Sequence, residues 1–161
     1  MKEYNNKSLK VKDIFKKKFV STTPNATLND AAKLIFGEHH KGLPVVEGKY
    51  KKLVGFISEQ DITSEMFPSI SDLMEDYVHE RDFEAMEMKI KPVLQKKVKD
   101  IMSKRVTYIH LEDPILKAES IMKVKGVGRL PVVDDKKHVI GIISKGDIFR
   151  ALVSPKVRGF K

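Results

Sequence analysis

Two copies of one short pattern carry the side chains that are best suited to chemistry in this chain. Each copy has a serine at the end of an expected strand and an aspartate three residues later, Ser58 with Asp61 and Ser144 with Asp147. This spacing is typical of a capping box, which satisfies the first free amides of a helix. A helix N-terminus after a glycine-bearing strand also suits an anion, because free amides and the positive end of the dipole lie there. The serine could donate to a phosphate and the aspartate could accept from two ribose hydroxyls, so the pattern suits a nucleotide as well as a cap.

The pattern occurs twice because a longer stretch of the chain is duplicated. Residues 11–46 match residues 98–133, and residues 53–62 match residues 139–148, with fifteen of the forty-six aligned positions identical. A duplicated unit usually packs against its copy, so a site made by one copy is expected to be made twice. Each copy has only about fifty residues, which is marginal for a core of its own. We therefore expect the two copies to share one core.

The elements that must position these side chains follow the same order in both copies: strand, helix, strand, strand and helix. In the first copy the sequence predicts strands at 19–22, 43–46 and 53–57, a helix at 28–36 capped by Thr27, and a helix opened by Ser58. In the second copy it predicts strands at 106–109, 130–133 and 139–143, a helix with the apolar stripe Ile115, Ala118, Ile121 and Met122, and a helix opened by Ser144. Gly55, inside a strand, predicts a bulge or the close approach of another segment.

The stretch between the copies has helical patterning of its own. Its apolar residues form two stripes, Leu73, Met74, Tyr77 and Val78 after a capping Ser71, and then Phe83, Met86 and Ile90. Pro92 is expected to start or break a helix. The sequence thus predicts a first repeat over 8–66, a helical insert over 67–97, a second repeat over 98–154 and a basic tail over 155–161.

Composition narrows the class of protein. The 161 residues include no cysteine, which excludes disulfides and thiol catalysis. The polar N-terminus has no apolar core of a signal peptide, and no apolar run approaches the roughly 20 residues of a membrane span, so we expect a soluble cytoplasmic protein without membrane contact. The sequence has no recognisable catalytic motif, and the adjacent His39 and His40 would point about 100° apart on a helix. We expect neither an enzyme nor a metal site.

The net charge of +9 leaves two interpretations open. A basic protein can bind nucleic acid or another anion, whereas a lysine-rich solvated surface is common in thermophile proteins. The lysines are scattered, apart from the run Lys16-Lys17-Lys18, and no aromatic residues interleave with them as a base-stacking platform would require.

The repeated motifs resemble the CBS domain, named after cystathionine β-synthase, in its usual tandem pair, the Bateman module. The matching motifs are Val-x-Asp-Ile at the start of each copy, Leu-Pro-Val-Val in the middle, and Gly-x-Ile-Ser-x-x-Asp-Ile at the end. The resemblance implies an α+β fold in which two β-α-β-β-α repeats pack sheet to sheet about a pseudo-twofold axis and leave two symmetric clefts. It also implies a homodimer, for which the helices opened by Ser58 and Ser144 are the interface candidates.

The resemblance further implies an adenosine-containing ligand, namely AMP, ADP, ATP or S-adenosylmethionine, as a regulatory ligand rather than a required cofactor. In the family the closing aspartate holds the ribose, here Asp61 and Asp147, and the motif serine approaches the phosphate, here Ser58 and Ser144. Residues at the first strand and its turn frame the adenine; they correspond to Thr22, Thr23 and Pro24 in one copy and to Ile109 and His110 in the other. A basic residue before the Leu-Pro strand often reaches phosphates, which assigns Arg129 to the cleft of Asp61.

The two copies differ at charged positions. Gly42 stands where the second copy has Arg129, and Glu59 stands where it has Lys145. We therefore expect inequivalent clefts, with the cleft of Asp61 and Arg129 preferring a phosphorylated nucleotide; Arg129 could instead be a surface residue paired with an acid. The function predicted is a non-catalytic sensor of adenine nucleotides, whose insert engages an effector protein or reports ligand state. The alternative function is nucleic-acid binding through the basic surface.

Overall fold

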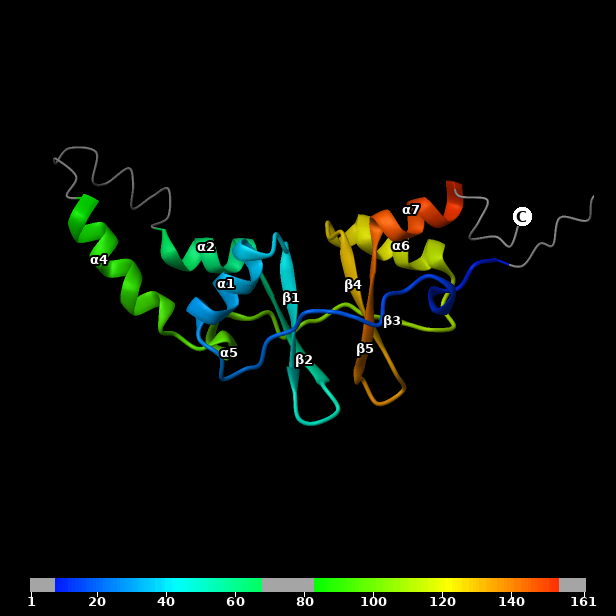
Figure 1. Ribbon diagram of the computed structural model, residues 1–161, viewed down its shortest axis with the longest axis horizontal. Helices are drawn as coiled ribbons and strands as arrows, with labels where there is room; N and C mark the ends of the chain where they lie inside the picture. The colour runs from blue at the N-terminus through cyan, green and yellow to red at the C-terminus, as the bar shows by residue number, and fades with distance from the viewer. Residues whose placement is uncertain (1–7, 68–82, 154–161) are drawn as a thin grey trace, which may run out of the picture. The chain divides into compact units, whose positions relative to one another are not determined.

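The chain folds into two compact units, each of which takes residues from both repeats (Figure 1). The computed structural model describes residues 8–67 and 83–153. Of the described residues, unit 1 contains 8–19, Tyr50–Lys52 and 107–153. Unit 2 comprises Val20–Lys49 and Leu53–Val106. The predicted mixture of small sheets and helices is confirmed in both units.

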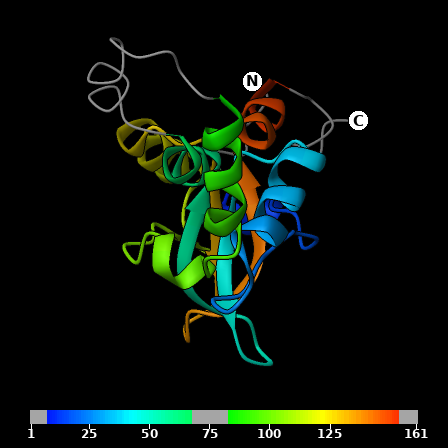
Figure 2. The same ribbon diagram turned by 90° about the vertical axis from the view of Figure 1, so that its left-hand side faces the viewer.

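Unit 2 places helices beside a two-stranded sheet. The strands are β1 (Gly42–Glu47) and β2 (Lys52–Ser58), and the helices are α1 (Leu28–Gly37), α2 (Glu59–Met66), α4 (Phe83–Leu94) and α5 (Val98–Ile101). Helices α1, α2 and α4 pack against one another, as the view onto unit 2 in Figure 2 shows. Thr27 caps α1 as predicted, since its Oγ1 accepts a hydrogen bond from the Asp30 amide at 3.1 Å. The buried cluster consists of Leu28, Ala31, Ile35, Leu43, Val45, Ile57, Ile62 and Val98.

Unit 1 is built around a three-stranded sheet. Its strands β3 (Ile109–His110), β4 (Arg129–Val133) and β5 (Val139–Ser144) lie in that order, with β3 parallel and β5 antiparallel to β4. The short helix η1 (Val11–Asp13) and helices α6 (Ile115–Lys125) and α7 (Lys145–Val153) complete the unit. The buried cluster consists of Val11, Ile109, Ile115, Ala118, Met122, Leu130, Val132, Ile143 and Ile148.

The first residues of each repeat lie in the core of the other repeat. Val11 belongs to the cluster of unit 1, and its counterpart Val98 belongs to the cluster of unit 2. The backbone bonds repeat as well: the Val11 amide donates to the Asp113 carbonyl at 2.9 Å, and the Val98 amide donates to the Ala26 carbonyl at 2.8 Å. The expectation of a single shared core was therefore wrong for the described residues, which form two clusters. A copy that is too small for its own core is completed by a segment of the other copy.

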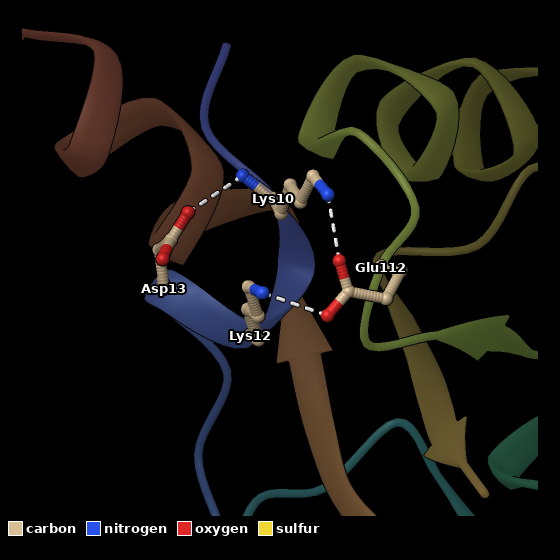
Figure 3. A network of polar contacts seen from close by, with 4 residues as sticks. All are labelled: Lys10, Lys12, Asp13 and Glu112. Carbon is tan, nitrogen blue, oxygen red and sulfur yellow. Dashed lines mark hydrogen bonds and ion pairs between the residues drawn. The ribbon is translucent and has the colours of Figure 1, made fainter. Parts of the chain in front are cut away.

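The exchanged segment of unit 1 is also held by charged side chains (Figure 3). The two oxygens of Glu112, in the turn after β3, accept from Lys10 Nζ at 2.6 Å and from Lys12 Nζ at 2.7 Å. The Asp13 carboxylate accepts a hydrogen bond from the Lys10 backbone amide at 2.8 Å and so caps the start of η1. These two lysines hold the pKa of Glu112 at about 2, below its usual value of 4.5.

The exchanged segments continue as an extra backbone pairing on the last strand of each unit. Lys16 and Ile142 on β5 exchange two backbone hydrogen bonds of 2.9 Å, and Ser103 and Phe56 on β2 do the same. A Cβ on Gly141 would overlap the Lys16 carbonyl, and a Cβ on Gly55 would overlap the Met102 side chain and lie 3.1 Å from the Ser103 carbonyl oxygen. The close approach predicted at Gly55 is thus confirmed, because Met102 and Ser103 lie directly against this glycine.

Several predicted elements differ in extent. The strand expected at 19–22 is only a parallel bridge between Thr22 and Val45, and the strand expected at 106–109 is β3, which covers Ile109–His110. Pro92 lies inside α4 rather than at its start or its break. It is two residues from the end of that helix. The predicted stripe from Leu73 to Val78 lies outside the described residues.

Candidate functional site

The first candidate site lies at the start of α2 in unit 2. The Ser58 amide donates to Asp61 Oδ2 at 2.8 Å, and the Asp61 amide donates to Ser58 Oγ at 3.1 Å, so the predicted capping box is formed. Among the described residues, 8–67 and 83–153, none forms a hydrogen bond or an ion pair with Asp61 Oδ1. A hydroxyl that accepts one bond can still donate its hydrogen. Capping therefore leaves the Ser58 hydroxyl and one Asp61 oxygen able to bind a ligand.

The second candidate site lies at the start of α7 in unit 1. The Ser144 amide donates to Asp147 Oδ2 at 3.1 Å, and the Asp147 amide donates to Ser144 Oγ at 3.1 Å. The other oxygen, Oδ1, accepts from the Arg150 guanidinium at 2.8 Å and lies 3.3 Å from Lys16 Nζ. Burial disfavours the charge on Asp147, but the bonds from Ser144, Arg150 and Lys16 outweigh it and lower the pKa of this carboxyl. The two closing aspartates thus share a cap and differ in electrostatic surroundings.

The residues expected to frame an adenine in the first copy lie in the same unit as Ser58 and Asp61. Thr22 is buried, and its backbone joins β1 through bonds to the Pro44 carbonyl at 3.1 Å and the Val46 amide at 2.9 Å. Thr23 and Pro24 follow in a turn, in which the Pro24 carbonyl accepts from the Lys99 amide at 3.0 Å. Unit 2 therefore contains all five residues that the sequence assigned to the first copy.

The corresponding residues of the second copy lie in unit 1 with Ser144 and Asp147. Ile109 is packed in the core through its side chain, which leaves its backbone as the part that could border a ligand. His110 is half-buried, its amide donates to Asp113 Oδ2 at 3.0 Å, and its ring meets Tyr108 edge to face. His110 is therefore the side chain of this pair that a ligand could contact.

Arg129 begins β4 directly opposite Ser144 in the antiparallel register. Its guanidinium-bearing side chain is exposed, and unit 1 thus carries a cation beside the serine of its own closing motif. At the matching position in unit 2, a Cβ on Gly42 would lie 2.5 Å from the Phe56 ring and 2.9 Å from the Ile57 carbonyl oxygen. A side chain at this position would require Phe56 and the Ile57 carbonyl to shift.

The first residue of each closing helix forms an exposed ion pair, and the two pairs have opposite polarity. Lys145 Nζ lies 3.7 Å from Glu119 Oε1 in unit 1, and Glu59 Oε2 lies 3.7 Å from Lys41 Nζ in unit 2. Lys145 is thus engaged with α6, and an anionic ligand would have to compete with Glu119 for it.

Sequence reasoning missed Lys16 and Arg150 as site residues. Arg150 could have been found, because a basic residue three positions after an acid lies on the same helix face. Lys16 could not, because its approach to Asp147 depends on the exchange of the N-terminal segment. Within the described ranges, no group of three or more potential metal-ligating His, Cys, Asp or Glu side chains occurs. The same residues contain no helix that is both long enough and apolar enough to cross a bilayer.

The repeated site and fold agree with a known family. The family model described as the CBS domain matches the chain twice, over residues 11–67 and 98–154. The chain belongs to the CBS domain family, as a tandem pair of these domains. The resemblance read from the repeated motifs is thereby confirmed, together with the tandem-repeat α+β fold that it implied.

Relatives and solved structures support the same classification. Protein MJ1426 of Methanocaldococcus jannaschii is 34% identical over 160 residues, which cover 92% of this chain and 94% of that protein. The crystal structure of protein MJ1225 from the same organism superposes with a TM-score of 0.74 at 23% identity, over 92% of this chain and 49% of that one, and shows the shared fold. The CBS domain pair of protein MJ0100, solved in complex with 5′-methylthioadenosine and S-adenosyl-L-methionine, has a TM-score of 0.64 at 26% identity, over 91% and 97% of the two chains. The chain spans 40% and 46% of the length of two other relatives from Methanocaldococcus jannaschii.

Proposed function

We propose that this CBS pair is a regulatory module that binds an adenosine-containing ligand, with the ribose hydroxyls at Asp61 and, in a second site, at Asp147. The observation that carries the proposal is the closing motif of unit 2, where the cap is complete and Asp61 Oδ1 has no partner among the described residues. The carboxylate is held in place by the helix start, so it can accept from a diol without reorganisation. A similar domain pair, that of MJ0100, was solved with two adenosyl ligands.

The same geometry supports a phosphate beside the serine. Ser58 Oγ accepts one amide hydrogen and retains its own hydrogen as a donor. The positive end of the α2 dipole lies at this point and favours an anion. We therefore propose AMP, ADP, ATP and S-adenosylmethionine as the candidate ligands, with Thr22, Thr23 and Pro24 at the adenine in the first copy and Ile109 and His110 in the second. Arg129 is proposed as a phosphate contact.

Ligand binding would act by shifting a population between two states of the pair, since a ligand can move an equilibrium only through differential affinity for its states. We propose the repeats over 8–66 and 98–154 as the binding unit and the insert over 67–97 as the part that engages an effector protein. A homodimer through the closing helices is also proposed. It is supported in α7 by Phe149 and Val153, which are exposed apolar side chains on one helix face.

A thermal-shift panel with AMP, ADP, ATP, S-adenosylmethionine and a short duplex DNA tests the proposal. An adenosyl ligand at 100 times its dissociation constant should stabilise the fold by about 2.7 kcal/mol. The duplex belongs in the panel because the net charge is +9. A shift with the duplex alone, lost steeply as salt is added, would instead favour nucleic-acid binding. Calorimetry on Asp61→Ala and Asp147→Ala then tests the expected inequivalence, and equal losses of affinity would count against it.

A further inference from the structure

The two closing aspartates occupy equivalent backbone positions but have different neighbours. Lys16 pairs with Ile142 on β5 as its counterpart Ser103 pairs with Phe56 on β2, each through two backbone hydrogen bonds of 2.9 Å. In unit 1 this position carries a lysine whose Nζ reaches Asp147. In unit 2 it carries a serine, whose Oγ bonds the Arg105 carbonyl instead. The lysine is therefore a specific addition to the site of unit 1.

The helix that follows shows the same substitution. Arg150 lies one turn after Asp147 and donates to its Oδ1 at 2.8 Å. The matching residue one turn after Asp61 is Ser64. Asp147 thus has two cations on the oxygen that is left over from capping, and at both positions Asp61 has a serine instead.

The Asp147 carboxylate is fixed, whereas the two cations can leave it. Its side chain is only 7% exposed and is tied to the helix start through Ser144. The side chains of Lys16 and Arg150 are 62% and 66% exposed, so either can swing into solvent. A ribose diol needs acceptor positions on the oxygen that these cations occupy, and it must therefore compete with them.

We propose that Lys16 and Arg150 compete with a ribose for the Asp147 carboxylate, so that this site binds adenosine weakly. A phosphorylated ligand is preferred, because its phosphate pairs with the two cations once the ribose has displaced them. The inference rests on the proposed function, because it assumes a ribose at Asp147. A phosphate beside Ser144 lies at the same helix start as both cations, so it can form ion pairs with them after they leave Asp147. Adenosine has no phosphate and offers them no such partner. Asp61 has no such competitor within the described residues, so a ribose at Asp61 does not have to displace a cation.

Reciprocal exchange of the matched residues tests the proposal. Asp61→Ala removes one site, so that only the Asp147 site remains to be measured. Asp147→Ala likewise leaves only the Asp61 site. In the Asp61→Ala chain, adding Lys16→Ser and Arg150→Ser should tighten adenosine by about fivefold, the upper end of what a solvent-exposed ion pair contributes. The preference for AMP over adenosine should shrink at the same time. In the Asp147→Ala chain, adding Ser103→Lys should weaken adenosine and increase the preference for AMP.

Calorimetry with adenosine and AMP measures both affinities, and circular dichroism checks that each variant is folded. Lys12→Ser is the matched control, because this lysine of the same segment pairs with Glu112 and not with Asp147; it should leave both affinities unchanged. Saturable binding with an unchanged ratio of AMP affinity to adenosine affinity in the variants that carry Lys16→Ser with Arg150→Ser, or Ser103→Lys, would overturn this inference and leave the proposed function standing. The absence of saturable heat with either ligand in every variant and in the unmodified chain would overturn the proposed function and this inference with it.

Discussion

The exchange of N-terminal segments makes a strong prediction about stability. Val98 is 0% exposed in the core of unit 2, although it begins the second repeat. Val98→Ala removes two carbons, worth about 0.8 kcal/mol each by transfer. The cavity that remains adds to this, so we expect a loss of about 2 to 3 kcal/mol in the free energy of unfolding. Val124→Ala, at a valine that is 82% exposed on α6, should change stability by less than about 0.5 kcal/mol.

Urea unfolding gives the size of the effect, and hydrogen exchange gives its place. Val98→Ala should speed exchange in α1, which lies in the same cluster, more than in α6, which belongs to its own repeat. Val11→Ala should do the reverse, because Val11 lies in the cluster that contains Ile115 and Met122. The placement of Val98 in the core of unit 2 is contradicted if Val98→Ala lowers the free energy of unfolding no more than Val124→Ala does, or if it speeds hydrogen exchange in α6 and leaves exchange in α1 unchanged.

Three further predictions concern single contacts. Gly141→Ala should destabilise unit 1 by more than about 1 kcal/mol in urea unfolding, because its Cβ would overlap the Lys16 carbonyl; a neutral result would argue against this pairing. Thr27→Ala should cost about 1 kcal/mol through loss of the α1 cap, and unfolding at an unchanged urea midpoint would speak against the cap. Because the pKa of Glu112 is lowered to about 2 by Lys10 and Lys12, its contribution to stability is complete above the usual value of 4.5 and lost as the pH falls towards 2. The unmodified chain should therefore lose more stability than Glu112→Gln between pH 5 and 2, and parallel pH profiles would contradict the assigned ion pairs.

Local patterns in the sequence predicted the parts of the fold that depend on neighbouring residues. The two Ser-x-x-Asp helix starts, the Thr27 cap and the close approach at Gly55 all follow from short-range geometry. The strand at 19–22 was overestimated because apolar residues in a short run do not reveal how many of them find a partner. Only Thr22 pairs with β1 there.

The arrangement of segments far apart in the chain could not be predicted in the same way. An apolar pattern shows that Val11 and Val98 are buried but not which core receives them. The prediction of one shared core failed for that reason. The contact between Lys16 and Asp147 was missed for the same reason, since it follows from the exchange and not from any spacing within a repeat.

The central claim is that the chain binds an adenosine-containing ligand through its two closing aspartates. Isothermal titration of the unmodified chain and of the Asp61→Ala, Asp147→Ala double variant with AMP and S-adenosylmethionine tests it most directly. We expect saturable heat with at least one ligand in the unmodified chain and none in the double variant, while both remain folded. Undiminished binding in the double variant, or no saturable heat in the unmodified chain, would contradict the claim.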